Sequence, residues 1–262
     1  RADTDADLGE FGHELSISDI AVDSAGINAL GYGNGAVTVV NGLNSGTLLN
    51  AALADEVQEF SAQIITSATA DMSALLESDR DAEIWGFNGV ASSVGVRVVQ
   101  TGDALVDVTN NGLIESTATV TGNLTANAWD LYANASNTAA MSAGVAALHQ
   151  GNANLNITNN GDIVGLASTS LNRNFSALDR ASLFEDYYSG NDAIQSATVA
   201  YGITVGHSGT GDIVITNHGN TTSEAVNSGD VSINAYGIGG DYGMLTVNTG
   251  AIGVAAHHSG TG

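Results

Sequence analysis

Cysteine, proline and lysine are all missing from the 262 residues of this chain. Without cysteine, disulfide bonds and thiolate metal sites are excluded. Without lysine, only five arginines stand against 28 acidic residues, and the formal net charge is −23. Nucleic-acid binding depends on clustered lysine and arginine, so a nucleic-acid partner is not expected. Apolar stretches are also too short to cross a bilayer, and no membrane span is expected.

A repeated motif is the strongest signal that is present. The motif consists of a small residue, any residue, glycine and then isoleucine or valine. It occurs at Ser93–Val96, Ser142–Val145 and Ala200–Ile203. Each copy is followed by Asn-x-Gly at one fixed distance, because the motif glycines 95, 144 and 202 precede the turn glycines 112, 161 and 219 by the same number of residues. Looser copies start at Ser24, Ala235 and Ala251. A fixed internal gap indicates one structural unit used repeatedly.

The segment before each Asn-x-Gly alternates apolar and polar residues, as in Leu155-Asn-Ile-Thr-Asn159. Alternation with period two predicts a strand with one buried face. A single short strand cannot bury that face alone, whereas stacked copies can, at a rise of roughly 4.8 Å per copy. Like residues would then lie over like. We therefore predict two structural side-chain ladders, one of Asn110, Asn159 and Asn217, and one of Thr109, Thr158 and Thr216.

These features predict an all-β fold, a parallel β-solenoid of the right-handed β-helix type, as a single domain over residues 1–262. A β-sandwich is the main alternative, but its strands do not share one motif at one gap. The repeat starts are unevenly spaced, which predicts helical or irregular insertions on one face at about 48–90, 120–142 and 165–198. The last repeat breaks off at Gly262. We therefore expect a longer chain or a polymeric assembly.

Two stretches within these insertions have helical spacing of apolar residues. Leu49, Leu53, Val57, Phe60 and Ile64 predict an amphipathic helix at about 50–66. Leu171, Phe175, Leu178 and Phe184 predict a second helix at about 169–186.

Four aromatic residues also fall in the insertions: Trp129, Tyr132, Tyr187 and Tyr188. The simpler interpretation packs them against the sheet wall. The alternative is a surface that contacts a ligand or partner.

Metal binding has little support. His207 and His258 occupy the same place in two repeats and could stack, but no histidine or carboxylate spacing frames them as ligands. We expect solvent-facing turn histidines, and no transition-metal site. Calcium could bind to the many carboxylates, at a site that the sequence does not identify, because no loop has EF-hand spacing.

Catalysis is not expected either. Asp103, Asp107, Asp162 and Asp212 lie on or near the repeated strands, where recurring carboxylates are usually solvated. No nucleophile elbow, phosphate loop or dinucleotide fingerprint occurs in its proper context. We predict that the chain is not an enzyme and that it has no cofactor.

The stretches Ile213-Val-Ile-Thr-Asn-His-Gly219 and Leu155-Asn-Ile-Thr-Asn-Asn-Gly-Asp-Ile163, with the small-x-Gly-Ile starts, resemble the passenger repeats of bacterial autotransporters and haemagglutinin-like adhesins. The resemblance covers about half of the chain. It implies a right-handed parallel β-helix, exported to the cell surface, that mediates adhesion or aggregation. We therefore expect an extracellular structural or adhesive protein, with host or surface glycans as possible partners.

Self-association is the second expectation about partners. A solenoid has two open ends, and neither terminus of this sequence reads as a cap. The sequence thus predicts a filament subunit that pairs head to tail with copies of itself. The alternative function is a polysaccharide-binding or polysaccharide-degrading β-helix.

Overall fold

The chain is all-β and parallel in the part that the structure describes. This computed structural model describes residues 2–7, 13–16, 20–42, 62–85, 88–134, 136–184, 194–239 and 245–261. No helix occurs among these residues, and their strands pair in parallel. The expectation of an all-β fold with stacked parallel strands is confirmed.

The strands form three sheets, which we call A, B and C. Sheet A contains β1 (Ala2–Asp7), β2 (His13–Ser16), β5 (Gln63–Glu77), β6 (Ala82–Trp85), β9 (Leu113–Asn134), β12 (Asp162–Phe184), β15 (Thr221–Asn227) and β16 (Val231–Gly239). Sheet B contains β3 (Ile20–Gly31), β7 (Gly89–Gln100), β10 (Ser136–Gln150), β13 (Ile194–Ser208) and β17 (Leu245–His258). Sheet C contains β4 (Val37–Asn41), β8 (Val106–Asn110), β11 (Leu155–Asn159) and β14 (Ile213–Asn217).

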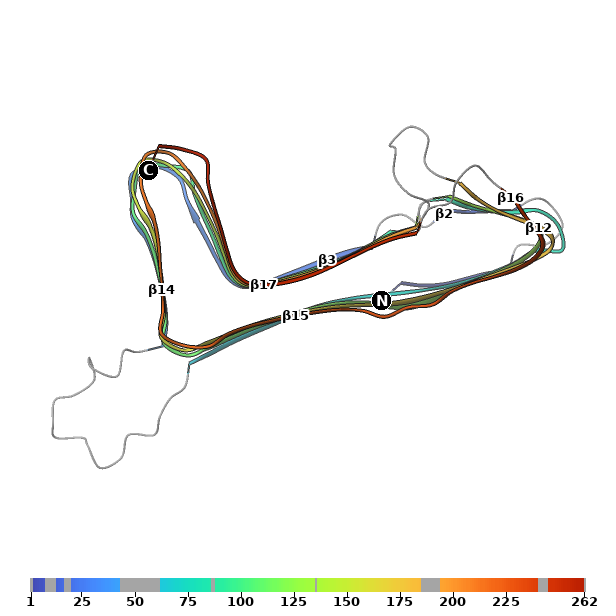
Figure 1. Cartoon of the computed structure of the whole chain (residues 1–262), viewed down its shortest axis with the longest axis horizontal. Helices are drawn as coiled ribbons and strands as arrows, with labels where there is room; N and C mark the ends of the chain where they lie inside the picture. Colours follow the sequence, from blue (N-terminus) through green and yellow to red (C-terminus); the bar gives the residue numbers. More distant parts are fainter. Residues whose placement is uncertain are drawn as a thin grey trace, which may run out of the picture.

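The chain visits the three sheets in one repeated order, B then C then A, and each pass adds one level to the stack. For example, β7, β8 and β9 follow one another along the chain, and each pairs with its counterpart in the next pass, β10, β11 or β12. Figure 1 shows these passes lying over one another, with sheet C at one end and the long strands of sheets A and B side by side. The repeat in the sequence is therefore one pass of the chain.

Sheet B bends partway along its strands (Figure 1), and in β7 the burial pattern changes phase at the glycine of the small-x-Gly motif. In β7, Ala91 and Ser93 are buried before the bend, and Val96 and Val98 after it, so the alternation changes phase at Gly95. A Cβ atom on Gly95 would lie 2.6 Å from the backbone oxygen of Gly144 and would also overlap a neighbouring isoleucine methyl group. The bend therefore requires a residue without a side chain at this place.

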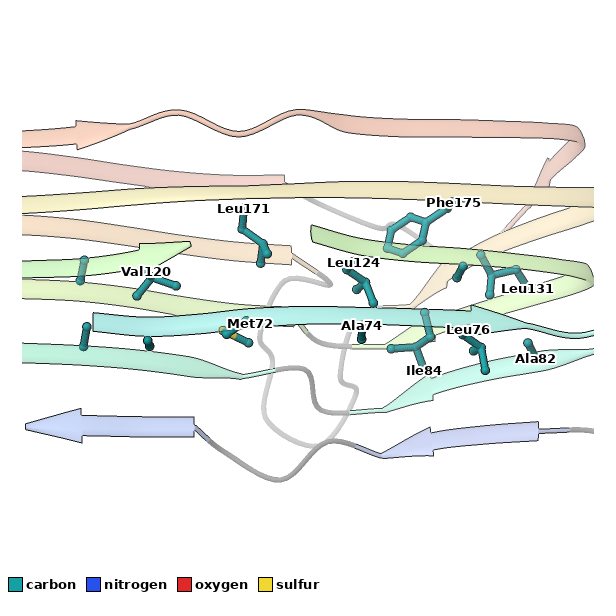
Figure 2. Close-up of a cluster of buried hydrophobic side chains, with 14 of the residues drawn as sticks. Met72, Ala74, Leu76, Ala82, Ile84, Val120, Leu124, Leu131, Leu171 and Phe175 are labelled. Carbon is teal, nitrogen blue, oxygen red and sulfur yellow. The ribbon is translucent and has the colours of Figure 1, made fainter. Parts of the chain in front are cut away.

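Two hydrophobic clusters fill the interior, one on each side of the bend. One joins the second half of sheet B to sheet C, with Val96, Val108 and Ile157 almost fully buried. The other lies between sheet A and the first half of sheet B, and Figure 2 shows its larger side chains, such as Met72, Leu124 and Phe175. Sheet B contributes mostly alanine to this second cluster, namely Ala91, Ala140 and Ala200. Each fully buried large side chain contributes about 1.5–3 kcal/mol to folding.

The helix predicted at about 169–186 is wrong, because the described residues to 184 belong to strand β12. Leu171 and Phe175 are four residues apart, a spacing that also places both on one face of a strand. Both are buried, whereas Leu178, an odd number of residues away, is 72% exposed. The spacing is therefore compatible with both structures, and packing against sheet B selects the strand.

The predicted insertions are also corrected where the structure describes them. Residues 120–142 lie mainly in β9 and β10, residues 165–184 in β12, and residues 63–77 in β5, so these stretches form the sheets themselves. The long strands of sheet A therefore make up much of each repeat. Of the helix predicted at about 50–66, Ile64 lies in β5, and residues 50–61 lie outside the described residues.

Candidate functional site: side-chain ladders and the exposed end of sheet C

Asparagines at the last position of each strand in sheet C form a hydrogen-bonded ladder. The Nδ2 atoms of Asn41, Asn110 and Asn159 each donate to the Oδ1 atom of the next asparagine, at 2.7 Å in every case. The first three are buried, and Asn217 at the end is exposed. The structure thus brings together Asn110, Asn159 and Asn217 and adds Asn41 from the looser repeat. The ladder is directional, because every amide donates toward the C-terminal end of the stack.

The threonines form a parallel row one residue earlier. Thr109, Thr158 and Thr216 are register partners in β8, β11 and β14, and each is half-buried. In β4 the same place is taken by Val40, which is 56% exposed. The three threonines are therefore in register, but the row ends at β8, because β4 has valine and not a hydroxyl residue at this position.

A second internal column extends the pair His207 and His258, which the sequence already placed at equivalent positions of two repeats. Gly31, Gln100, His149, His207 and His258 lie in register in sheet B. Each lies five residues after its motif glycine, and that constant offset is the signal that could have revealed the column. His149 and His207 are fully buried, so the expectation of solvent-facing turn histidines is wrong for these two.

The column closes the turn between sheets B and C by binding backbone carbonyls. The Nε2 atoms of His149, His207 and His258 lie 2.9–3.0 Å from carbonyl oxygens of the neighbouring turn. A carbonyl only accepts, so each Nε2 carries the proton. His207 and His258 stack with ring centroids 4.9 Å apart. Because each Nε2 is already committed to a carbonyl, the column does not offer the convergent nitrogens of a metal site.

Only two of the four aromatic residues predicted to form a contact surface lie among the described residues. Trp129 is 51% exposed on the outer face of β9, and Tyr132 is half-buried three residues later in the same strand. Tyr187 and Tyr188 lie outside the described residues. The structure therefore brings no pair of predicted aromatic residues together from different strands among those it describes.

Charged groups are sparse on sheet B, and one ion pair joins two of its strands. Arg97 on β7 donates two hydrogen bonds of 2.9 Å to the two carboxylate oxygens of Asp23 on β3. The hydrogen bond from Arg97 is the main reason that the pKa of Asp23 lies below its usual value, and the same contact raises the pKa of Arg97. Arg173 differs, because burial within sheet A lowers its pKa to about 10.

An open hollow of about 560 Å³ lies at the C-terminal end of the stack. It is lined by Asp212, Ile213, Val214 and Ile215 from the edge of sheet C, and by Ala256 and His258 from β17. β17 extends sheet B one strand beyond β14, the last strand of sheet C among the described residues. The hollow therefore lies where sheet B extends beyond the last described strand of sheet C.

Neither a metal cluster nor a membrane-spanning helix is found in the part of the chain that the structure describes. No group of three or more histidine, aspartate or glutamate residues there is arranged to hold a metal ion. Asp103, one of the carboxylates considered for catalysis, instead accepts hydrogen bonds from the backbone and side chain of Asn152. Among the same residues, no helix has the length and apolarity needed to span a bilayer.

Comparisons with known proteins add no relative. The chain matches no protein-family model, no curated protein and no solved structure.

Proposed function

We propose that the chain is an extracellular structural or adhesive protein, built as one right-handed parallel β-solenoid domain over residues 1–262. The observation that carries this proposal is the repeated order of sheets B, C and A, with like residues in register at each level. Crossovers between parallel strands are right-handed in about 98% of cases, which favours that hand. The resemblance of the repeats to autotransporter passengers supports placement at the cell surface.

The stack presents strand edges at both ends, and we propose that these edges pair head to tail. Among the described strands, β3 and β4 form one edge of sheets B and C, and β17 and β14 form the other. An edge strand carries unpaired backbone donors and acceptors. A heterologous contact between two different ends does not close on itself, so it extends into a filament. The net charge of −23 opposes association, and added salt or divalent cations should therefore promote it.

Sedimentation velocity over a range of protein and salt concentrations, with negative-stain images, tests this assembly. We expect rods that lengthen with concentration. Val254→Lys, at an exposed residue of β17, should shorten them by placing a charge at the end of the stack. Thr69→Lys, on the outer face of β5, adds the same charge away from that edge and serves as the control. Short rods of constant length at every concentration would remove the filament proposal.

A polysaccharide-binding protein is the second candidate, favoured by the outer face of sheet A. Ser73, Asn123 and Asn172 lie in register there, and Asn172 donates a 3.0 Å hydrogen bond to Asn123. Trp129 is exposed on the same face of β9, and exposed aromatic rings stack on the apolar faces of sugars. A glycan array with the unmodified chain and with Trp129→Ala tests this candidate. A lyase assay with calcium tests whether the chain degrades polysaccharides. No glycan binding and no lyase activity would rule out this second candidate.

A further inference from the structure

An exposed apolar column crosses three neighbouring strands of sheet A. It consists of Trp129 in β9, Leu178 in β12 and Tyr236 in β16, which are 51%, 72% and 94% exposed. These residues lie side by side, because the residues directly before them are register partners, namely Ala128, Ala177 and Ala235. Neighbouring strands are spaced at about 4.8 Å, so the backbones of the two aromatic residues lie roughly 10 Å apart along the stack.

A bulge in β12 presents the middle of this exposed column. Leu178 and Asp179 lie opposite one residue of β9 and one residue of β16, because the register shifts between Ala177 and Arg180. Both Leu178 and Asp179 are exposed. A bulge re-aims the side chains that it carries and is often found next to active sites. The exposed column therefore coincides with an irregularity of the sheet that turns side chains toward solvent.

A row of uncharged polar residues runs beside the exposed column. Asn127, Ser176 and Asn234 are register partners in β9, β12 and β16, and each lies two residues before a member of the column. Residues two apart in a strand point to the same face, so the polar row and the column share the outer face of sheet A. Asn127 and Ser176 are half-buried and Asn234 is exposed. The row therefore offers amide and hydroxyl groups, which both donate and accept hydrogen bonds, next to the aromatic rings.

This combination of groups suits a sugar ring. The C–H faces of a pyranose stack on aromatic rings, and its hydroxyl groups need donors and acceptors beside them. A protein interface is a poorer fit, because three side chains present much less than the roughly 800 Å² that each partner of a standard interface buries. One level of the stack, about 4.8 Å, is also close to the length of one sugar residue in a polymer. A polysaccharide that runs along the stack therefore meets one member of the column with each sugar residue.

The charges near the exposed column select against an acidic ligand. The backbone N–H of Trp129 donates to the carbonyl of Arg80 at 2.9 Å, which places the turn between β5 and β6 beside the column. Arg80 is an exposed cation of this turn. The exposed acids of the same region are Glu77, Asp79, Asp81 and Asp179. With a net charge of −23 on the whole chain, this surface repels an anionic polysaccharide.

We propose that a neutral polysaccharide lies along the stack over Trp129, Leu178 and Tyr236. Its sugar rings stack on the two aromatic side chains, and its hydroxyl groups form hydrogen bonds with the polar row beside them. The proposal rests on the second candidate function, polysaccharide binding, and it assigns the site and the class of ligand. Because the exposed column crosses three levels, the ligand must be long enough to reach both rings.

Affinity electrophoresis tests the class of ligand. The gels contain hydroxyethyl cellulose, laminarin or mannan, which are neutral, or alginate, which is acidic. We expect at least one neutral polymer to retard the unmodified chain, and alginate to have no effect. Oligosaccharides from the neutral polymer that binds should show rising affinity in titration calorimetry until they are long enough to reach both Trp129 and Tyr236.

Substitutions in the exposed column test the site. Trp129→Ala and Tyr236→Ala should each weaken binding about tenfold, because each removes one stacking ring. Tyr236→Phe keeps the ring and should stay within about twofold of the unmodified chain. Leu178→Tyr adds a ring between the two and should tighten binding. Tyr32→Ala is the matched control, because it removes a tyrosine that is 78% exposed and follows β3 in sheet B, and binding should be unchanged. Urea unfolding checks that every variant is folded.

The failure of this site can be distinguished from the failure of the second candidate function. If the unmodified chain binds a neutral polymer but Trp129→Ala and Tyr236→Ala bind it equally well, the site is overturned and polysaccharide binding stands. If no neutral polymer retards the unmodified chain, both are overturned. Stronger binding to alginate would overturn the class of ligand. Alanine variants that change the sedimentation of the chain, and not its binding to polysaccharide, would show that the exposed column contacts protein instead.

Discussion

The side-chain amide of Asn110 donates to Asn159 across neighbouring strands at 2.7 Å, and Asn159 donates in the same way to Asn217. These residues are 49 and 58 positions apart in the chain, yet they make the same contact. Asn159 is the fully buried centre of this ladder. The ladder therefore links successive passes in one register, since a shift of one residue would leave buried amides without partners.

Asn159→Ala should destabilise the chain by about 2–4 kcal/mol, because it removes two amide contacts and leaves Asn110 with an unpaired buried donor. Asn217→Ala, at the exposed end of the same ladder, should cost less, about 1 kcal/mol, because water can reach this end and replace the Oδ1 atom that accepts from Asn159. Urea unfolding followed by circular dichroism measures both. Equal costs at the two positions would show that burial does not determine the strength of the ladder.

Gly144→Ala should be strongly destabilising, because the new Cβ atom would lie 2.8 Å from the backbone oxygen of Gly202 and against the Ile163 methyl group. Overpacking of this kind costs about 1–3 kcal/mol. Gly253→Ala changes the same motif position in β17, where a Cβ atom meets nothing within 4 Å, and it should be nearly neutral. Thermal unfolding of the two variants compares them directly, and similar midpoints would contradict the packing explanation for the motif glycine.

His149→Gln should be tolerated within about 1 kcal/mol, because Gln100 occupies the same column and its Nε2 atom donates to Gly33 in the preceding turn. His149→Leu keeps the volume but leaves the Gly102 carbonyl without its donor, and it should cost about 1–3 kcal/mol. Unfolding midpoints in urea distinguish the two. If leucine is as well tolerated as glutamine, the column acts through packing and not through hydrogen bonds.

Asp23→Asn should lower stability at neutral pH by less than about 1 kcal/mol, since the Asp23–Arg97 pair is largely solvent-exposed. The folded pKa of Asp23 lies below the ordinary value of 3.8, so the contribution is complete above that pH and is lost as the pH falls through the lower, folded pKa. The unmodified chain and the variant should therefore converge in stability as the pH falls below the folded pKa of Asp23. Urea unfolding of the unmodified chain and the variant at pH 7 and at a series of lower pH values measures this difference in stability. Repeating the series in roughly 0.5 M salt, which screens the ion pair, should reduce the difference. A difference that grows as the pH falls would contradict the prediction.

The sequence determined the repeating unit and its chemistry. Alternating apolar residues such as Leu155 and Ile157, followed by Asn159 and a turn glycine, indicate short strands that need neighbours above and below. Stacking such copies places equal positions over each other, so the asparagine ladder could be predicted from the local pattern alone.

Packing between distant segments selects which long stretches extend the sheets and which residues lie inside. The four-residue spacing of Leu171 and Phe175 fits one face of a helix or of a strand, and packing against sheet B selects the strand. His149 and His207 are polar, but the bend at Gly144 and Gly202 turns them inward, where backbone carbonyls satisfy them. Burial depends on contacts between residues about 50 positions apart, and local periodicity does not contain that information.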